Sequence, residues 1–403
     1  MPVNLNLAPG IAIDGIGLAP ISAGIKSDGS PDLLLVVLPE NSTCAGVFTK
    51  NIFCAAPVTV AKAHLSSSNG SVRAMLINSG NANAGTGQLG IDMAQGHCEA
   101  AASVLNFKSD QILPFSTGVI GQLLPDEVML AGIEKAALEL GQDWSGAARS
   151  IMTTDTEPKL TSRQISVDGE VITITGMAKG AGMIQPNMAT MLAYLFTDAS
   201  IEQSTLQQAL TASVDTSFNS ITVDSDTSTN DACMLVATGE KGVLGSDHKD
   251  WPKFMTALST VALDLAQAII RDAEGATKFI TVTVLGGRDI AQCKTVGYAI
   301  ANSPLVKTAM FASDANVGRL LMAIGKTEIE SLDAAAIRVS IGDVCAFEGG
   351  GIASGYTEEQ GAAIMAESEI KITVELGAGQ ASANVYTSDL SHEYVTVNAD
   401  YRS

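Results

Sequence analysis

Short apolar runs that end at proline or glycine constrain the fold of this sequence most strongly. Residues 32–39 (DLLLVVLP) and 72–80 (VRAMLINSG) are continuous runs of this kind. Residues 169–176 (GEVITITG) and 278–287 (KFITVTVLGG) are also rich in β-branched residues and end at glycine. Such runs are typical of buried β-strands, so we predict a strand in each of these four segments.

Amphipathic segments lie between these strands. Helices are predicted over residues 90–106, 125–141, 204–215 and 253–275, two of which stop at glycine. Ser204 and Gln207 have the spacing of a capping box, which predicts that the third helix begins there. The mixture of strands and helices indicates the α/β class.

The remainder of the chain has a different pattern. Helices are predicted near residues 290–301 and 357–367, and residues 369–389 are predicted to form a β-hairpin closed by GAGQ. The 403 residues are enough for two or three domains. We therefore expect a larger domain over residues 1–287 and a smaller α+β domain over residues 288–403.

Composition excludes several classes of protein. With 23 basic and 43 acidic residues the net charge is −20, which disfavours binding to nucleic acid or to an anionic membrane surface. No apolar run reaches membrane-spanning length, and the N-terminus does not resemble a signal or transit peptide. A cytoplasmic protein is expected.

The familiar cofactor and metal motifs are incomplete or absent in this sequence. The six cysteines form no CxxC pair and do not cluster with the four histidines, so no metal site is predicted. KGAG at residues 179–182 lacks the third glycine of a nucleotide-binding loop. Residues 224–231 (DSDTSTND) lack the glycine and the final glutamate of a calcium loop and are interpreted as a hydrogen-bonded turn. No GxSxG elbow is present.

The segment 176–199 (GMAKGAGMIQPNMATMLAYLFTDA) places a threonine, Thr190, between a Gly/Pro/Asn loop and an apolar run. A threonine hydroxyl is a poor nucleophile without a base, and no histidine is nearby. The α-amine of Thr190 itself would serve as the base if the Ala189–Thr190 bond were cut, because such an amine titrates near ~7.7–8.0. From the residues alone, an ordinary buried threonine remains the favoured interpretation.

This segment resembles the signature of the ArgJ family, the glutamate/ornithine N-acetyltransferases of arginine biosynthesis. Six further segments resemble the family in the same order, so the resemblance spans essentially the full chain: residues 116–121 (STGVIG), 151–159 (IMTTDTEPK), 217–231, 274–280 (EGATKFI), 302–309 (NSPLVKTA) and the C-terminal VTVNADYRS. The resemblance implies self-cleavage between Ala189 and Thr190, which would give chains 1–189 and 190–403 with Thr190 as the nucleophile.

The resemblance also implies the remaining site residues. Thr117 and Gly118 match the pair that forms the oxyanion hole, where a hydroxyl and a backbone N–H stabilise the charge of a tetrahedral intermediate. Substrate contacts carry over to Thr156, Lys179, Thr190, Glu274, Asn398 and Ser403. We expect Lys179 to pair with a substrate α-carboxylate and Glu274 to receive an ornithine ammonium. Gly85, residues 313–319 and the Arg402-Ser403 end depart from the common family pattern, which bears on fine substrate preference.

The activity implied is acetyl transfer from N²-acetyl-L-ornithine to L-glutamate through an acetyl-Thr190 ester, with no metal or organic cofactor. Some family members also use acetyl-CoA as donor and are bifunctional. The implied fold is a layered αββα arrangement related to the DmpA aminopeptidases, with a smaller C-terminal domain, assembled from two copies of each chain. Two alternatives are an N-terminal-nucleophile amidase or aminopeptidase of the same fold and a non-catalytic binding protein in which Thr190 belongs to the core.

Overall fold

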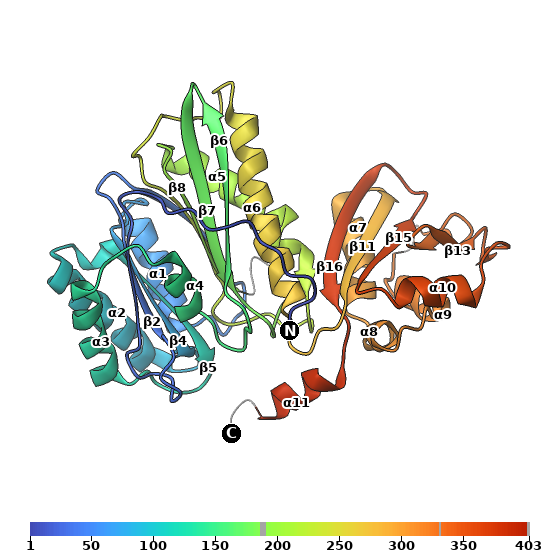
Figure 1. Ribbon diagram of the computed structural model, residues 1–403, viewed down its shortest axis with the longest axis horizontal. Helices are drawn as coiled ribbons and strands as arrows, with labels where there is room; N and C mark the ends of the chain where they lie inside the picture. Colours follow the sequence, from blue (N-terminus) through green and yellow to red (C-terminus); the bar gives the residue numbers. More distant parts are fainter. Residues whose placement is uncertain (186–190, 330–331, 401–403) are drawn as a thin grey trace.

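The computed structural model describes residues 1–185, 191–329 and 332–400 (Figure 1). The strands of this described part form three β-sheets with four, five and seven members. The first two sheets and their helices make up one body, and the third sheet lies to one side of it with its own helices (Figure 1).

The first sheet has the strand order β1-β2-β4-β5 and is antiparallel except for the parallel pair β4 and β5. The predicted strands at 32–39 and 72–80 and the predicted helices at 90–106 and 125–141 are confirmed. The elements of this part are β1 (Gly17–Ile21), β2 (Leu33–Val37), α1 (Ala56–Ser67), β4 (Ala74–Asn81), α2 (Gly87–Leu105), β5 (Ile112–Val119), α3 (Asp126–Leu138) and α4 (Trp144–Ser150).

The second sheet has the order β3-β10-β8-β7-β6, with β8 and β10 parallel. Its elements are β3 (Thr43–Phe48), β6 (Lys159–Val167), β7 (Glu170–Lys179), β8 (Leu192–Thr197), α5 (Gln203–Thr216), β10 (Ala232–Ala237) and α6 (Trp251–Arg271). The capping box predicted for α5 is wrong. The helix begins at Gln203, and the Ser204 hydroxyl instead donates to the carboxylate of Glu202, the residue that precedes the helix.

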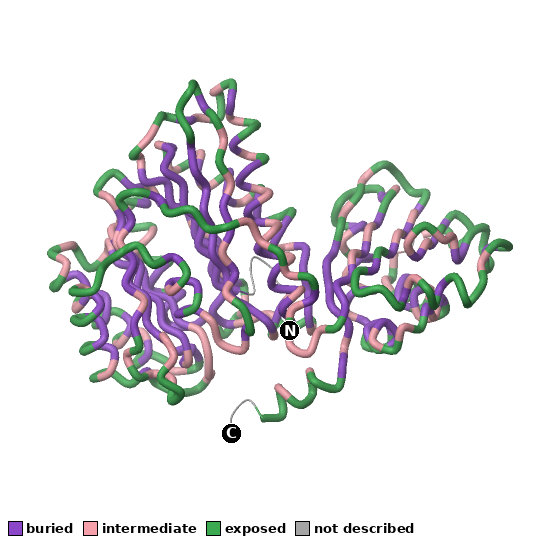
Figure 2. The backbone as a smooth tube through the Cα atoms, in the orientation of Figure 1, coloured by how far each residue is buried: buried purple, intermediate pink, exposed green. Residues whose placement is uncertain are grey.

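The two sheets pack face to face with helices on both outer sides. Along β2, Leu34 faces the second sheet, whereas its neighbour Leu35 packs against α2 and α3. Along β8, Tyr194 faces the first sheet and Leu195 packs against α5 and α6. Both faces of each sheet are therefore buried, which explains the continuous apolar runs (Figure 2). The layered αββα arrangement expected from the resemblance is confirmed.

Helix α6 is the one helix of the described chain that is long and apolar enough to cross a membrane by length and composition. Its apolar side, including Leu258 and Leu265, is buried against the second sheet. An amphipathic helix packed in this way belongs to the protein core.

The third sheet has the order β14-β13-β12-β15-β11-β16-β9. The hairpin predicted over residues 369–389 is wrong, because β11 lies between β15 and β16, parallel to the first and antiparallel to the second. The connecting loop crosses the end of β11, where the N–H groups of Ala378 and Gly379 donate to the Gly286 carbonyl at 2.8 Å. The predicted helices near 290–301 and 357–367 are confirmed. The elements are β9 (Ile221–Thr222), β11 (Phe279–Gly287), α7 (Ile290–Ala301), α8 (Pro304–Phe311), α9 (Val317–Gly325), β12 (Arg338–Ile341), β13 (Val344–Glu348), β14 (Gly351–Ile352), α10 (Glu358–Met365), β15 (Glu369–Glu375), β16 (Ala381–Ser388) and α11 (His392–Asp400).

The position of β11 bears on the domain boundary. This strand ends at Gly287 and contributes Ile280, Val282 and Val284 to the core between the third sheet and its helices. We therefore propose that the C-terminal domain begins between α6 and β11, earlier than the boundary after Gly287 expected from the sequence.

Candidate active site

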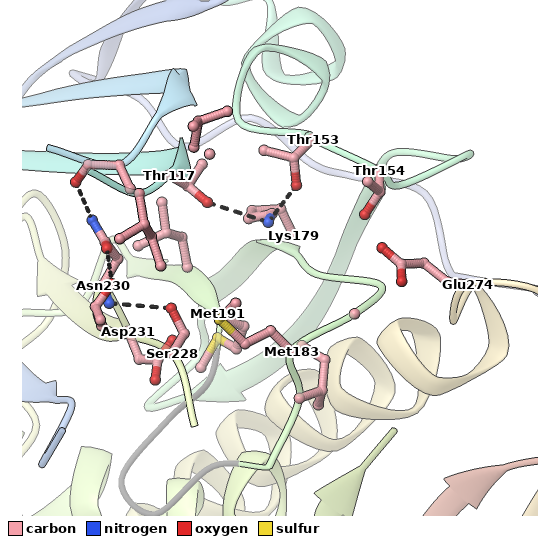
Figure 3. A pocket seen from close by; sticks show the side chains of 18 of the residues that line it. Thr117, Thr153, Thr154, Lys179, Met183, Met191, Ser228, Asn230, Asp231 and Glu274 are labelled. Atoms are coloured by element: carbon pink, nitrogen blue, oxygen red, sulfur yellow. Dashed lines mark hydrogen bonds between the residues drawn. The ribbon is translucent and has the colours of Figure 1, made fainter. Parts of the chain in front are cut away.

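A cavity of about 280 Å³ lies where β5 and β7 end and where β8 and β10 begin. Its lining combines the ends of these strands with the loop after β7 and with Glu274 after α6 (Figure 3). Asn398 of α11 also lines it. Of the residues predicted from the sequence, the cavity brings together Thr117, Gly118, Lys179, Glu274 and Asn398.

Lys179, the last residue of β7, is the buried cation of this cavity. Its Nζ donates to Thr153 Oγ1 at 2.7 Å and to Thr117 Oγ1 at 3.3 Å (Figure 3). Burial lowers the pKa of Lys179 from its ordinary value, and the nearby carboxylate of Asp155 opposes that shift. Because the Thr117 oxygen accepts from Lys179, its own O–H can donate to a group bound in the cavity.

Gly118 follows Thr117 at a point where β5 approaches β4 very closely. Its φ of +133° is one that residues with a side chain rarely adopt, and a Cβ here would lie 2.3 Å from the carbonyl carbon of Gly80. The pairing of β4 and β5 is irregular at the same place. Only glycine therefore fits this corner of the cavity, directly beside the Thr117 hydroxyl.

The predicted nucleophile follows the loop after β7. Ala189 and Thr190 lie outside the described residues, but Met191, the next residue, lines the cavity. The Met191 carbonyl accepts from the Ala232 N–H at 3.0 Å, so the chain is held to β10 immediately after Thr190.

Glu274 lines the cavity away from Thr117 (Figure 3), and Asn398 contacts it. Asn398 Nδ2 donates to Glu274 Oε2 at 2.7 Å, and the Glu274 N–H donates to the Ala181 carbonyl at 3.0 Å. A Cβ on Gly182 would lie 2.4 Å from Glu274 Oε2, so the glycine leaves room for this carboxylate. Ser403 lies outside the described residues.

Thr156 is not among the residues that line the cavity. Its hydroxyl and N–H both donate to the Asp272 carboxylate. Lys159 is fully buried between Asp272, at 2.7 Å, and Asp155, at 2.6 Å. Asp155 also accepts from the Gly180 N–H at 2.6 Å, so this buried cluster supports the backbone next to Lys179.

The cavity residues that were not predicted from the sequence include Thr153, Asn230 and Asp231. Asn230 Nδ2 donates to the carbonyls of Ala82 and Ser116 at 2.6 and 2.8 Å, which joins the two sheets beside the cavity. Asp231 is buried, which raises the pKa of its carboxyl well above the ordinary value, and its Oδ2 has no hydrogen-bond partner in the described chain. The polar run 224–231 is the sequence feature that could have indicated Asn230 and Asp231 as site residues, but a hydrogen-bonded turn explains this run equally well.

Within the described residues, no group of three or more His, Cys, Asp or Glu side chains is placed to hold a metal ion. The polar groups that line the cavity are hydroxyl groups, backbone N–H groups, the Lys179 ammonium and carboxylates.

Comparison with known proteins decides the family. The model of the ArgJ family matches residues 18–403. The chain belongs to the ArgJ family. It is 49% identical over 414 residues to the arginine biosynthesis bifunctional protein ArgJ of Pseudomonas syringae pv. tomato and 48% identical over 408 residues to that of Pseudomonas fluorescens, with 100% of each chain covered in both comparisons.

A solved ornithine acetyltransferase from Mycobacterium tuberculosis, complexed with ornithine, is also similar, at 36% identity. That match covers 45% of this chain and 96% of the solved chain, with a TM-score of 0.39. The prediction of an ArgJ-family acyltransferase of arginine biosynthesis is confirmed by the full-length relatives and the family match.

Proposed function

We propose that this chain cuts itself between Ala189 and Thr190 and then transfers an acetyl group from N²-acetyl-L-ornithine to L-glutamate. The observation that carries the proposal is the arrangement of Thr117, Gly118 and Lys179 around the cavity that Met191 enters. Such a cavity offers donors for an oxyanion next to the position from which a Thr190 hydroxyl would attack.

In the first half-reaction, Thr190 Oγ attacks the acetyl carbonyl and the Thr190 α-amine takes the hydroxyl proton. The Thr117 hydroxyl and the Gly118 N–H donate to the resulting oxyanion. When the tetrahedral intermediate collapses, its C–N bond breaks, the ornithine amine takes the proton from the Thr190 ammonium, and an acetyl ester remains. The amine of glutamate then attacks this ester, and the same steps in reverse release N-acetyl-L-glutamate and restore Thr190.

The substrate roles follow from charge. Lys179 provides a buried positive charge for the α-carboxylate, and Glu274 provides a negative charge for the side-chain ammonium of ornithine. Asn398 holds Glu274 at 2.7 Å and brings an amide into the same region. The contacts of Thr156 and Ser403 with substrate stay predictions, as do the cytoplasmic location and an assembly of two copies of each chain.

The full-length relatives are named bifunctional. We accordingly propose that acetyl-CoA also acetylates Thr190, which would supply N-acetylglutamate without consuming acetylornithine. That neither reaction needs an organic cofactor stays a prediction.

Intact-mass spectrometry under denaturing conditions, with N-terminal sequencing, tests self-cleavage. We expect one chain that ends at Ala189 and one that begins Thr190-Met191-Leu192. Thr190→Ala should remain a single chain, and Thr190→Ser should still be cut because it keeps the hydroxyl. A wild-type chain that stays uncut on long incubation would overturn the proposed base and leave the binding-only alternative.

A product assay separates acetyl transfer from hydrolysis. With glutamate present we expect N-acetylglutamate and ornithine in equal amounts, and with glutamate absent we expect little ornithine in the steady state. Rapid release of acetate and ornithine without glutamate would favour the amidase alternative.

A further inference from the structure

Asp224 occupies a position between the loop that follows β7 and helix α11. It follows the short strand β9 and is half-buried. Its two carboxylate oxygens accept the N–H groups of Met183 and Ile184 at 2.7 and 2.8 Å. The same carboxylate accepts the Tyr394 hydroxyl of α11 at 3.1 Å.

The loop that Asp224 holds has an unusual backbone. Met183 has a φ of +54°, a left-handed conformation that a residue with a long side chain adopts at an energetic cost. Two neighbouring backbone bonds bind the same loop to the segment around Asp224: the Val223 N–H donates to the Ile184 carbonyl at 2.7 Å, and the Gln185 N–H donates to the Asp226 carbonyl at 2.9 Å. The loop is therefore held to this segment as far as Gln185, the last residue described before Met191.

Tyr394 connects this carboxylate to the far side of the cavity. It lies one helical turn before Asn398 on α11, and Asn398 Nδ2 donates both to the Tyr394 carbonyl at 2.9 Å and to Glu274 at 2.7 Å. Partial burial and the adjacent Asp224 raise the pKa of Tyr394, so its hydroxyl remains a donor at neutral pH.

We propose that Asp224 is a positioning residue with two separable roles, which rests on the proposed function of Thr190. Through Met183 and Ile184 it fixes the loop that presents the Ala189–Thr190 bond for self-cleavage. Through Tyr394 it holds α11, and with it Asn398, against the cavity in which substrate binds. Asp224 contacts neither substrate nor the reacting atoms.

The first test is the rate of self-cleavage in Asp224→Asn, followed by intact mass from the uncut precursor. The amide presents a donor where one backbone N–H needs an acceptor, so we expect cleavage to slow by about tenfold or more. Asp198→Asn is the matched control, because Asp198 accepts the Thr173 N–H at 2.8 Å and pairs with Lys241 at 2.9 Å away from the cavity. Asp198→Asn should cleave at the wild-type rate.

The second test separates the role of α11. Tyr394→Phe keeps the bonds from Asp224 to Met183 and Ile184, so self-cleavage should keep its wild-type rate. The KM for N²-acetyl-L-ornithine should rise by about three- to tenfold with little change in kcat, because Asn398 is held less firmly. Tyr298→Phe is the control. It removes a comparable hydrogen bond, which the hydroxyl of Tyr298 on α7 donates to the Asn219 carbonyl at 3.0 Å.

Hydrogen exchange in the Thr190→Ala chain distinguishes failure of this inference from failure of the proposed function, because it needs no reaction. Replacing Asp224 by Asn in that chain should speed exchange of the Met183 and Ile184 amides by about tenfold, and Tyr394→Phe should speed exchange across α11 alone. The inference is overturned if these amides exchange at the unsubstituted rate, or if Asp224→Asn cleaves as fast as wild type with an unchanged KM.

Discussion

At the scale of single residues, Lys179 is the group whose protonation most directly affects the cavity. The titratable groups that face it are Lys26, Asp155, Lys159, Asp231 and Glu274. Burial lowers the pKa of Lys179 in spite of the carboxylates, so it loses its proton at a pH below that of an ordinary lysine. Below that pH its ammonium can bind a carboxylate, and above it the attraction disappears.

We therefore predict a bell-shaped pH dependence of kcat/KM for N²-acetyl-L-ornithine. Activity should rise as the Thr190 α-amine loses its proton near ~7.7–8.0, and it should fall again as Lys179 is neutralised. Lys179→Arg should move the alkaline fall to higher pH, because a guanidinium stays protonated. An alkaline fall at the same pH in Lys179→Arg would assign it to another group.

At the scale of structural elements, the junction of β4 and β5 sets the corner of the predicted oxyanion hole. Gly118→Ala would place a methyl group 2.3 Å from the Gly80 carbonyl carbon at a φ of +133°. We expect a loss of stability of about 2 kcal/mol or more and a loss of kcat of about a hundredfold. Denaturant unfolding of the uncut Thr190→Ala chain measures the first, and steady-state kinetics the second.

Gly96→Ala is the matched control for this substitution. Gly96 lies within α2, and a Cβ there would have no other atom within 4 Å. Alanine should stabilise this helix slightly and leave the kinetics unchanged. Equal effects at Gly96 and Gly118 would contradict the special role of the β4–β5 junction.

The sequence predicts helices and strands where local periodicity determines them. It does not predict which strands pair with each other in a sheet. The ranges of β2 and α2 follow from apolar runs and helical spacing that the sequence displays directly. The placement of β11 between β15 and β16 depends on contacts between segments far apart in the chain, so the local turn signal of residues 377–380 predicted a hairpin instead.

The candidate site likewise depends on contacts that the local sequence does not predict. Thr117, Gly118 and Lys179 were assigned from resemblance to a family, because no local pattern distinguishes them from a strand end. The bond from Lys179 to Thr153 joins segments 26 residues apart, and that from Asn230 to Ser116 joins segments 114 residues apart. Tertiary packing alone creates these contacts, so the local sequence around Thr153, Asn230 and Asp231 does not predict that they line the cavity.

At the scale of the whole molecule, the chain turns back after the third sheet, and α11 runs toward the body formed by the first two sheets (Figure 1). Asn398 of this helix lines the cavity. After β16, Asp389 accepts the N–H groups of Thr277 and Lys278 at 2.8 and 2.9 Å, and the Ser391 hydroxyl donates to the Gly275 carbonyl at 2.7 Å. These bonds fix the start of α11 beside Glu274. The seven-stranded sheet thus acts as a support for the helix that carries Asn398.

A buried lysine, Lys307, lies beside the seven-stranded sheet, and its titration affects the stability of the folded chain. Lys307 of α8 donates to Thr387 Oγ1 at 2.8 Å and to the Ser388 carbonyl at the end of β16. Burial lowers its pKa to about 8, with Asp389 and Asp224 opposing the shift. Between pH 8 and 10.5 the folded chain binds fewer protons at this site than the unfolded chain, so the Lys307 contribution to stability increases as pH rises.

We predict that the free energy of unfolding of wild type, relative to Lys307→Met, increases by about 3 kcal/mol as pH rises from 7 to 10.5, because each pKa unit corresponds to about 1.4 kcal/mol. Below about pH 7 Lys307 is protonated in both states, so the difference should be nearly constant there. Denaturant unfolding of the uncut Thr190→Ala chain, with and without Lys307→Met, measures this difference and cancels the titration of all other groups. Parallel stability curves across this range would show that Lys307 keeps an ordinary pKa, and would place water rather than a dry core around the end of β16.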